Sequence, residues 1–163
     1  MSGKLFLICP TDFIEQILKN QFESECFFYN ALGLNFHWDN DTVNAILCLV
    51  NKYSIDDIVF ISDFRNAFYK NCLEEKKELN TCASVLKLSQ TLKSIKPQFY
   101  FSKSIDEKMR VIASKHLCEQ EYKLKKMLSE NIHYKISALL FDRKTDSFLH
   151  PSYSSLGFDI QLN

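Results

Sequence analysis

The strongest constraint on the fold is a series of short apolar runs, each separated from the next by a segment with the apolar spacing of a helix. The first three runs are Lys4–Cys9, Cys26–Tyr29 and Ile58–Ile61. Continuous apolar runs of this length are typical of strands covered on both faces, as in a parallel sheet. Because strand–helix–strand connections are nearly always right-handed, the pattern predicts an α/β fold with a mostly parallel central sheet and helices on both faces.

The segments between these runs predict two helices and a turn. The first helix begins after Pro10, with Thr11 or Asp12 as its N-cap, and the second is preceded by cap residues 39–42 and stopped by residues 54–57. Residues 30–35 are predicted to form a turn. The apolar positions of the first helix are Phe13, Ile14, Ile17, Leu18 and Phe22, and those of the second are Val43, Ala45, Ile46, Leu47, Leu49 and Val50.

The second half of the chain predicts more helix and then a late hairpin, which we expect at the edge of the sheet. The predicted segments are a charged helix face at 74–78, an apolar helical stripe at 83–92, a long helix from about Ile105 to Ser129, a strand at Lys135–Asp142 and a hairpin strand at Phe148–Leu149.

The composition fits a single globular domain spanning residues 1–163, with 46% hydrophobic and 25% charged residues. Twenty basic and twenty acidic residues cancel, so neither nucleic acid nor an anionic membrane is expected as a partner. The apolar run near the N-terminus is too short for a signal peptide or a membrane span, so we expect a cytoplasmic protein. Most of the six cysteines are then expected to be small buried hydrophobic residues: Cys9, Cys26, Cys48, Cys72, Cys82 and Cys118.

Four segments, in order and over nearly the whole chain, resemble the β-class carbonic anhydrases. They are LFLICPTDFIEQIL, ECFFYNALGLN, DTVNAILCLVNKYSIDDIVFISDF and ISALLFDRKTDSFL. In that family the first segment contains Cys-x-Asp-x-Arg, which supplies a zinc ligand and a catalytic Asp-Arg pair. The third leads to Gly-His-x-x-Cys-Gly, which supplies the other two zinc ligands. The resemblance implies a β-carbonic-anhydrase-like α/β fold.

The chain departs from this family at the positions that bind zinc. Cys9 lies at the first ligand position, but Thr11 replaces the aspartate and Phe13 the arginine of the pair. Ser62 falls at the histidine position and Arg65 at the second cysteine position. Catalytic zinc needs three protein donors, and a guanidinium has no lone pair and repels a dication. The resemblance therefore implies a degenerate member without the family zinc site.

The strand ends would gather a polar pocket in place of the metal. In one interpretation Arg65 holds a carboxylate, bicarbonate or phosphate, with hydrogen bonds from Asn30 and Ser62. In the other, Arg65 forms a salt bridge with Asp63 or Asp12 that preserves the fold. The candidate pocket residues are Cys9, Thr11, Asp12, Asn30, Ser62, Asp63 and Arg65.

The histidines add no obvious ligand set, because His37, His116, His133 and His150 are dispersed and none lies near Cys9 in the sequence. His116 and Glu119, three residues apart on a predicted helix, are expected on an exposed polar face.

These observations lead to two hypotheses of different classes. The first is a catalytically inactive, carbonic-anhydrase-like protein without a cofactor, which binds a small anion or a protein partner. The alternative is an active enzyme, either a carbonic anhydrase with an unusual zinc ligand set or another α/β activity using Cys9 and Asp63. An open sheet edge would also allow a homodimer.

Overall fold

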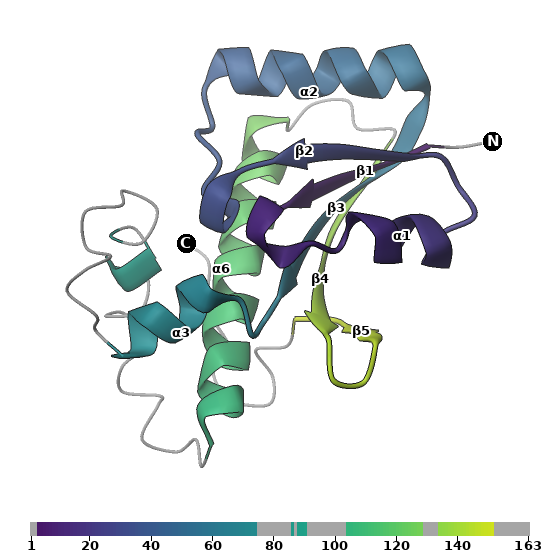
Figure 1. Ribbon diagram of the computed structural model, residues 1–163. Helices are drawn as coiled ribbons and strands as arrows, with labels where there is room; N and C mark the ends of the chain where they lie inside the picture. Colours follow the sequence, from purple (N-terminus) through teal and green to yellow (C-terminus); the bar gives the residue numbers. More distant parts are fainter. Residues whose placement is uncertain (1–2, 75–85, 87, 91–103, 129–133, 152–163) are drawn as a thin grey trace.

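The computed structural model describes residues 3–74, 86, 88–90, 104–128 and 134–151, and shows an α/β arrangement (Figure 1). The strands are β1 (Gly3–Ile8), β2 (Cys26–Asn30), β3 (Ile55–Asp63), β4 (Lys135–Asp142) and β5 (Ser147–Leu149). The helices are α1 (Glu15–Gln21), α2 (Asn40–Tyr53), α3 (Ala67–Glu74) and α6 (Ile105–Met127), with short 3-10 helices η1 (Pro10–Asp12) and η2 (Leu32–Leu34).

The strands form one sheet in the order β2-β1-β3-β4-β5. The first four are parallel, and β5 pairs antiparallel with β4 at the edge. The mostly parallel sheet and the late hairpin at its edge are therefore confirmed. Strand β2 forms the other edge, so the homodimer through an open edge stays a prediction. Ile8 lies opposite both Asn30 and Ile61, so β1, β2 and β3 reach the same edge of the sheet with their carboxyl ends.

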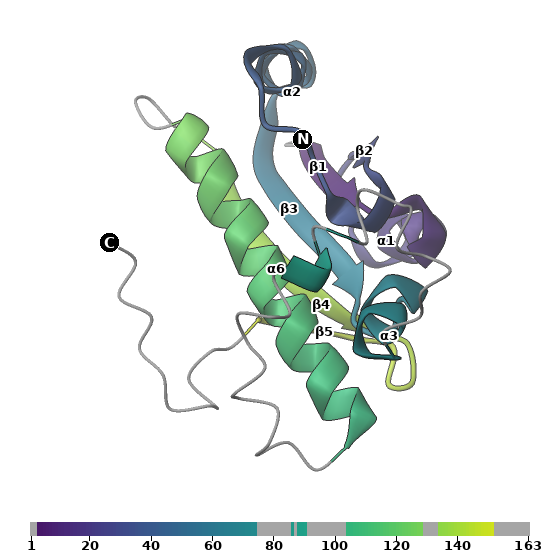
Figure 2. The ribbon, with the colours of Figure 1, turned by 90° about the vertical axis from the view of Figure 1, so that its left-hand side faces the viewer.

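Alternating side chains of the inner strands build a core on each face of the sheet. Leu5, Leu7 and Phe60 belong to a cluster that contains residues of α2, α3 and α6. Phe6 and Ile61 belong to a second cluster with residues of α1. Figure 2 shows α6 and α1 on opposite sides of the sheet. Helices on both faces, as predicted from the uninterrupted apolar runs, are thus observed.

The two long helices begin at side-chain caps. The carboxylate of Asp39 accepts a hydrogen bond from the Thr42 N–H (2.8 Å) at the start of α2. Ser104 and Glu107 form a reciprocal capping box at the start of α6. The cap residues predicted before α2 are confirmed by this geometry, and Ser54, in a left-handed conformation, ends the helix.

The first predicted helix differs from the observed one. Pro10 starts a 3-10 turn, and α1 begins only at Glu15. Phe13, expected on the buried face, lies between the two with a positive φ of 51° and is 77% exposed. Asp12 caps neither helix, because its side chain is buried against β3. The turn at Pro10 therefore rotates Phe13 away from the core.

Strand β3 is longer than predicted, since it begins at Ile55 rather than Ile58. Residues 55–57 were expected to stop the preceding helix. Asp57 is accommodated in the strand because it forms an ion pair with Lys4 on β1.

The described cysteines are free thiols, and they are less buried than expected. Cys9 and Cys72 are buried, Cys26 and Cys118 partly so, but Cys48 is exposed, so the expectation is wrong for it. Cys82, residues 75–78 of the charged face and most of the stripe at 83–92 lie outside the described residues. Among the described helices, none is long and apolar enough to cross a membrane.

Candidate functional site at the carboxyl ends of the strands

Cys9 and Ser62 lie side by side at the ends of β1 and β3. The register pairs Ile8 with Ile61, which places the residues that follow them, Cys9 and Ser62, about 4.8 Å apart. The Cys9 Sγ accepts a hydrogen bond from the Gly33 N–H (3.1 Å) and lies 3.0 Å from the Thr11 Oγ1. Cys9 is buried, so its thiol is enclosed by η1 and η2.

Asp12 is the buried centre of this region. Its carboxylate accepts hydrogen bonds from the Ser62 hydroxyl (3.2 Å), the Asp63 backbone N–H (3.2 Å) and the Asn66 side-chain amide. Burial raises the pKa of Asp12 to about 7, although the hydrogen bonds from Asn66, Asp63 and Ser62 oppose that rise. The group therefore takes up and releases a proton near neutral pH.

Asn66 connects this centre to α3. Its amide nitrogen donates to the Thr11 Oγ1 (3.1 Å) and to Asp12, and its amide oxygen accepts from the Phe68 N–H (2.8 Å). Each polar group of the Asn66 side chain thus has a partner, which fixes the start of α3 against η1.

Tyr69, in the first turn of α3, lies beside Cys9 and Ser62. Burial raises the pKa of Tyr69 far above its usual range; a hydrogen bond with Ser62 opposes that rise, and the negative charge of Asp12 adds to it. Its ring meets His116 edge to face, with ring centroids 6.2 Å apart. The phenol is therefore neutral and part of the enclosed polar network.

The expectation that His116 lies on an exposed face with Glu119 is wrong. His116 is buried, and its Nε2 is 3.0 Å from the Gly33 carbonyl oxygen. His116 lies on the buried face of α6, which is wide enough to include it, and its side chain therefore contacts η2 rather than solvent.

Arg65 is directed away from Asp12. Its guanidinium binds Asp106 (Nη2 to Oδ2, 2.9 Å) on α6 and Asp142 at the end of β4, and it stacks on the Phe64 ring. The predicted salt bridge with Asp12 or Asp63 is wrong for this side chain. Only the backbone N–H of Arg65 reaches Asp63 (2.9 Å).

A different arginine reaches the polar centre. The Nε of Arg143, in the turn after β4, donates to Asp63 Oδ2 (2.9 Å), and its Nη2 donates to the backbone carbonyl of Asp12. Sequence reasoning missed this residue. The sequence did contain a sign of it. Asp142 and Arg143 lie at the end of a strand predicted to join the sheet, and residues at the carboxyl end of a parallel strand lie at the edge where ligands bind.

The structure thus brings all seven predicted pocket residues to one edge of the sheet, but only five of them into one hydrogen-bonded group. Cys9, Thr11, Asp12, Ser62 and Asp63 are connected to one another through direct hydrogen bonds or through Asn66, whereas the Arg65 side chain faces α6. Asn30 is exposed at the end of β2, and in the described part of the chain no hydrogen bond joins its side chain to the others. The residues missed by sequence reasoning are Asn66, Tyr69, His116 and Arg143.

These residues do not fit a zinc ion. Among the described residues, no group of three or more His, Cys, Asp and Glu side chains is placed to hold a metal. Asp12 already accepts three hydrogen bonds, and Arg65 is held by two carboxylates. Cys9 remains as a single strong donor, which is too few for a tetrahedral site.

Comparison with known structures identifies the fold. A β-carbonic anhydrase of Aspergillus fumigatus, CafA, superposes with a TM-score of 0.73 over 91% of this chain and 74% of that chain, at 14% identity. A tetrameric β-carbonic anhydrase of Sordaria macrospora gives 0.73 over 91% and 80%, at 13% identity. The Coccomyxa β-carbonic anhydrase in complex with acetazolamide gives 0.68 over 91% and 71%, at 13% identity. The chain therefore has the β-carbonic anhydrase fold.

Sequence comparisons give no further assignment. No protein-family model matches the chain, and no curated protein matches its sequence.

Proposed function

We propose that this protein is a binding module built on the β-carbonic anhydrase fold and that it does not hydrate CO2 through zinc. The observation that carries the proposal is the state of positions 62 and 65. The Ser62 hydroxyl donates a hydrogen bond to Asp12, and Arg65 is bound to Asp106 and Asp142. Both positions therefore serve a hydrogen-bond network instead of presenting metal donors.

The same edge of the sheet supports binding of a small anion. In open α/β sheets, ligands bind beyond the carboxyl ends of the strands. Arg143 and Lys144 follow β4 at this edge, and Arg110 lies one turn into α6. These side chains supply N–H donors that suit an oxyanion.

An enzyme that uses Cys9 and Asp63 has less support. Cys9 is 1% exposed and Asp63 5% exposed. Asp63 is also engaged by the Arg143 guanidinium and by the Arg65 N–H. A nucleophile and a base must reach a substrate, and these two groups are covered.

The test is a metal and activity measurement on the full chain. Protein produced with zinc in the medium is expected to contain far less than one zinc per chain and to give no stopped-flow CO2 hydration above the buffer rate. A β-carbonic anhydrase prepared in the same way is the positive control. Stoichiometric zinc together with a hydration rate would overturn the proposal.

A further inference from the structure

The carboxyl edge carries a cluster of seven charged side chains, which we call the edge cluster. Its cations outnumber its carboxylates by four to three, although the whole chain has equal numbers of both. The positive excess holds while the neighbouring Asp12 is protonated, and the two signs balance when it is ionised. The members are Arg65, Arg110, Arg143, Lys144, Asp63, Asp106 and Asp142.

The two signs of charge are distributed differently between the interior and the solvent. The side chains of Asp63 and Asp142 are 7% and 8% exposed, whereas those of Arg110, Arg143 and Lys144 are 48%, 49% and 68% exposed. Asp106 is the exception, with 35% of its side chain exposed against 20% for Arg65, so an approaching molecule meets the donors of three cations together with one carboxylate. The buried acids hold the cations in place without covering their outer faces.

Two of the exposed cations have donors available for a ligand. The Arg143 guanidinium is fixed through Nε and Nη2 by Asp63 and the Asp12 carbonyl, which leaves Nη1 without a bond to the described residues. The Nη2 of Arg110 is 3.8 Å from Asp142, a distance of electrostatic attraction but not of a hydrogen bond. A fixed guanidinium loses less conformational entropy on binding than a free one.

Lys144 completes the arrangement. Its ammonium donates to Asp106 (3.1 Å), which is shared with Arg65, so one of its three donors is used. Arg65 shares its single charge between Asp106 (2.9 Å) and Asp142, so Lys144 also neutralises Asp106 and keeps two ammonium donors for an incoming anion.

We propose that the edge cluster binds a phosphate group, free or as a monoester, through Arg110, Arg143 and Lys144; this inference rests on the proposed binding function and names its ligand class. A phosphate oxyanion has three or more acceptor oxygens and up to two charges, which matches forked guanidinium donors and an ammonium. A singly charged carboxylate would use fewer of these donors.

The experiment is a titration of the 15N-labelled full chain with inorganic phosphate and, separately, with glycerol 2-phosphate, followed by NMR at constant ionic strength. Saturable shifts are expected at the Nε–H signals of Arg110 and Arg143. Tighter binding of the ester identifies a monoester ligand, and equal or weaker binding identifies free phosphate. Arg110→Gln and Lys144→Gln should each weaken binding about tenfold, the effect of losing one charge-assisted hydrogen bond.

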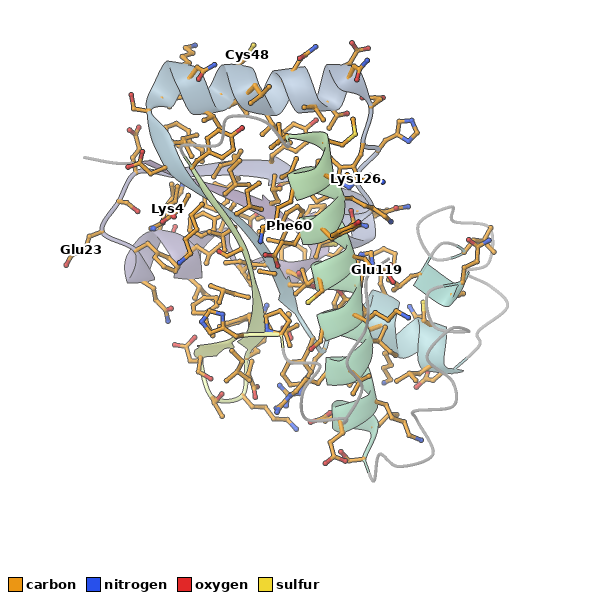
Figure 3. The ribbon with its side chains drawn as sticks, turned by 180° about the vertical axis from the view of Figure 1, so that it is seen from behind. Lys4, Glu23, Cys48, Phe60, Glu119 and Lys126 are labelled. Carbon is orange, nitrogen blue, oxygen red and sulfur yellow. The ribbon has the colours of Figure 1, made fainter. Side chains whose placement is uncertain are left out.

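Lys126→Gln is the matched control. It removes the same charge from the exposed C-terminal end of α6, about 24 Å along the helix from Arg110 (Figure 3). This variant should change the affinity less than twofold. Shifts that chloride reproduces, or equal weakening by Lys126→Gln, would overturn the phosphate site. That failure leaves the metal and hydration measurements untouched, so it is distinguishable from failure of the proposed function.

Discussion

Asp12 is subject to two opposing influences. Burial favours its neutral form, whereas the three donors around it, from Ser62, Asp63 and Asn66, favour the carboxylate. Burial is the larger effect and raises the pKa of Asp12 to about 7 from its ordinary value of 3.8. The folded state therefore binds a proton more tightly than the unfolded state does.

This difference predicts how stability depends on pH. Between about pH 4 and 7 the unfolded chain has lost the Asp12 proton and the folded chain retains it, so stability falls with rising pH by about 1.4 kcal/mol per unit. Asp12→Asn removes this titrating group, so the free energy of unfolding of the variant should depend less on pH between about pH 4 and 7. From pH 5 to 7 the free energy of unfolding of the native protein should thus fall about 2 kcal/mol more than that of the variant, as measured by urea denaturation.

Asp56→Asn is the control, because Asp56 is exposed on the same strand that contacts Asp12. Its profile should run parallel to that of the native protein. At pH 5, where the native Asp12 is protonated, the asparagine amide resembles the neutral carboxyl group, so Asp12→Asn should change stability there by less than about 1 kcal/mol. Parallel profiles for native protein and Asp12→Asn would contradict the assignment of this pKa.

At the level of elements, Arg65 joins the end of β3 to α6 and to the end of β4. Its partners Asp106 and Asp142 both have lowered pKa values. At Asp106 the hydrogen bond from Arg65 is the main cause. At Asp142 burial raises the pKa, but the Arg65 hydrogen bond and the backbone donors together outweigh burial. Both carboxylates therefore stay ionised at neutral pH, and the junction holds the first turn of α6 against the sheet.

Loss of this junction should destabilise the protein locally. Arg65→Gln leaves the buried Asp142 without its closest cation, and we expect a loss of about 3 kcal/mol in the free energy of unfolding. Arg110→Gln, which removes a half-exposed partner of the same carboxylate, should cost at most about 1 kcal/mol. Chemical denaturation measures both values, and hydrogen exchange should show the loss in the first turns of α6. Equal costs for the two variants would contradict this role of Arg65.

The elements differ in how well sequence could predict them. The strands were predictable because apolar runs such as Ile58–Ile61 are encoded locally. The partners of Arg65 were not, because Asp106 and Asp142 lie 41 and 77 residues away and nothing near position 65 specifies them. Phe13 was misplaced because helical spacing does not reveal the 3-10 turn at Pro10.

On the scale of the whole molecule, the fold and the site follow different constraints. The sheet and its two cores need apolar residues of suitable size, which many sequences supply, so the fold is shared with carbonic anhydrases at 14% identity. A zinc site needs particular donors at particular positions. The location of the candidate pocket, at the edge where the strands end, was predictable from the sequence. The hydrogen bonds and ion pairs within it were not, because they join segments that are distant in the sequence.

This separation predicts that a metal site can be built on the existing backbone. Ser62→His combined with Arg65→Cys adds an imidazole next to Cys9, which follows the residue paired with Ile61, and a thiol three residues further along the chain. The double variant should bind one zinc per chain by metal analysis, and with cobalt it should show the visible spectrum of a tetrahedral thiolate site. Each single change provides at most two donors and should not retain zinc. Without metal, loss of the Arg65 ion pairs should make the double variant about 3 kcal/mol less stable than the native protein, and zinc should recover this loss. A folded double variant that takes up no zinc would show that Tyr69 and the Asp12 network fill the space a metal needs.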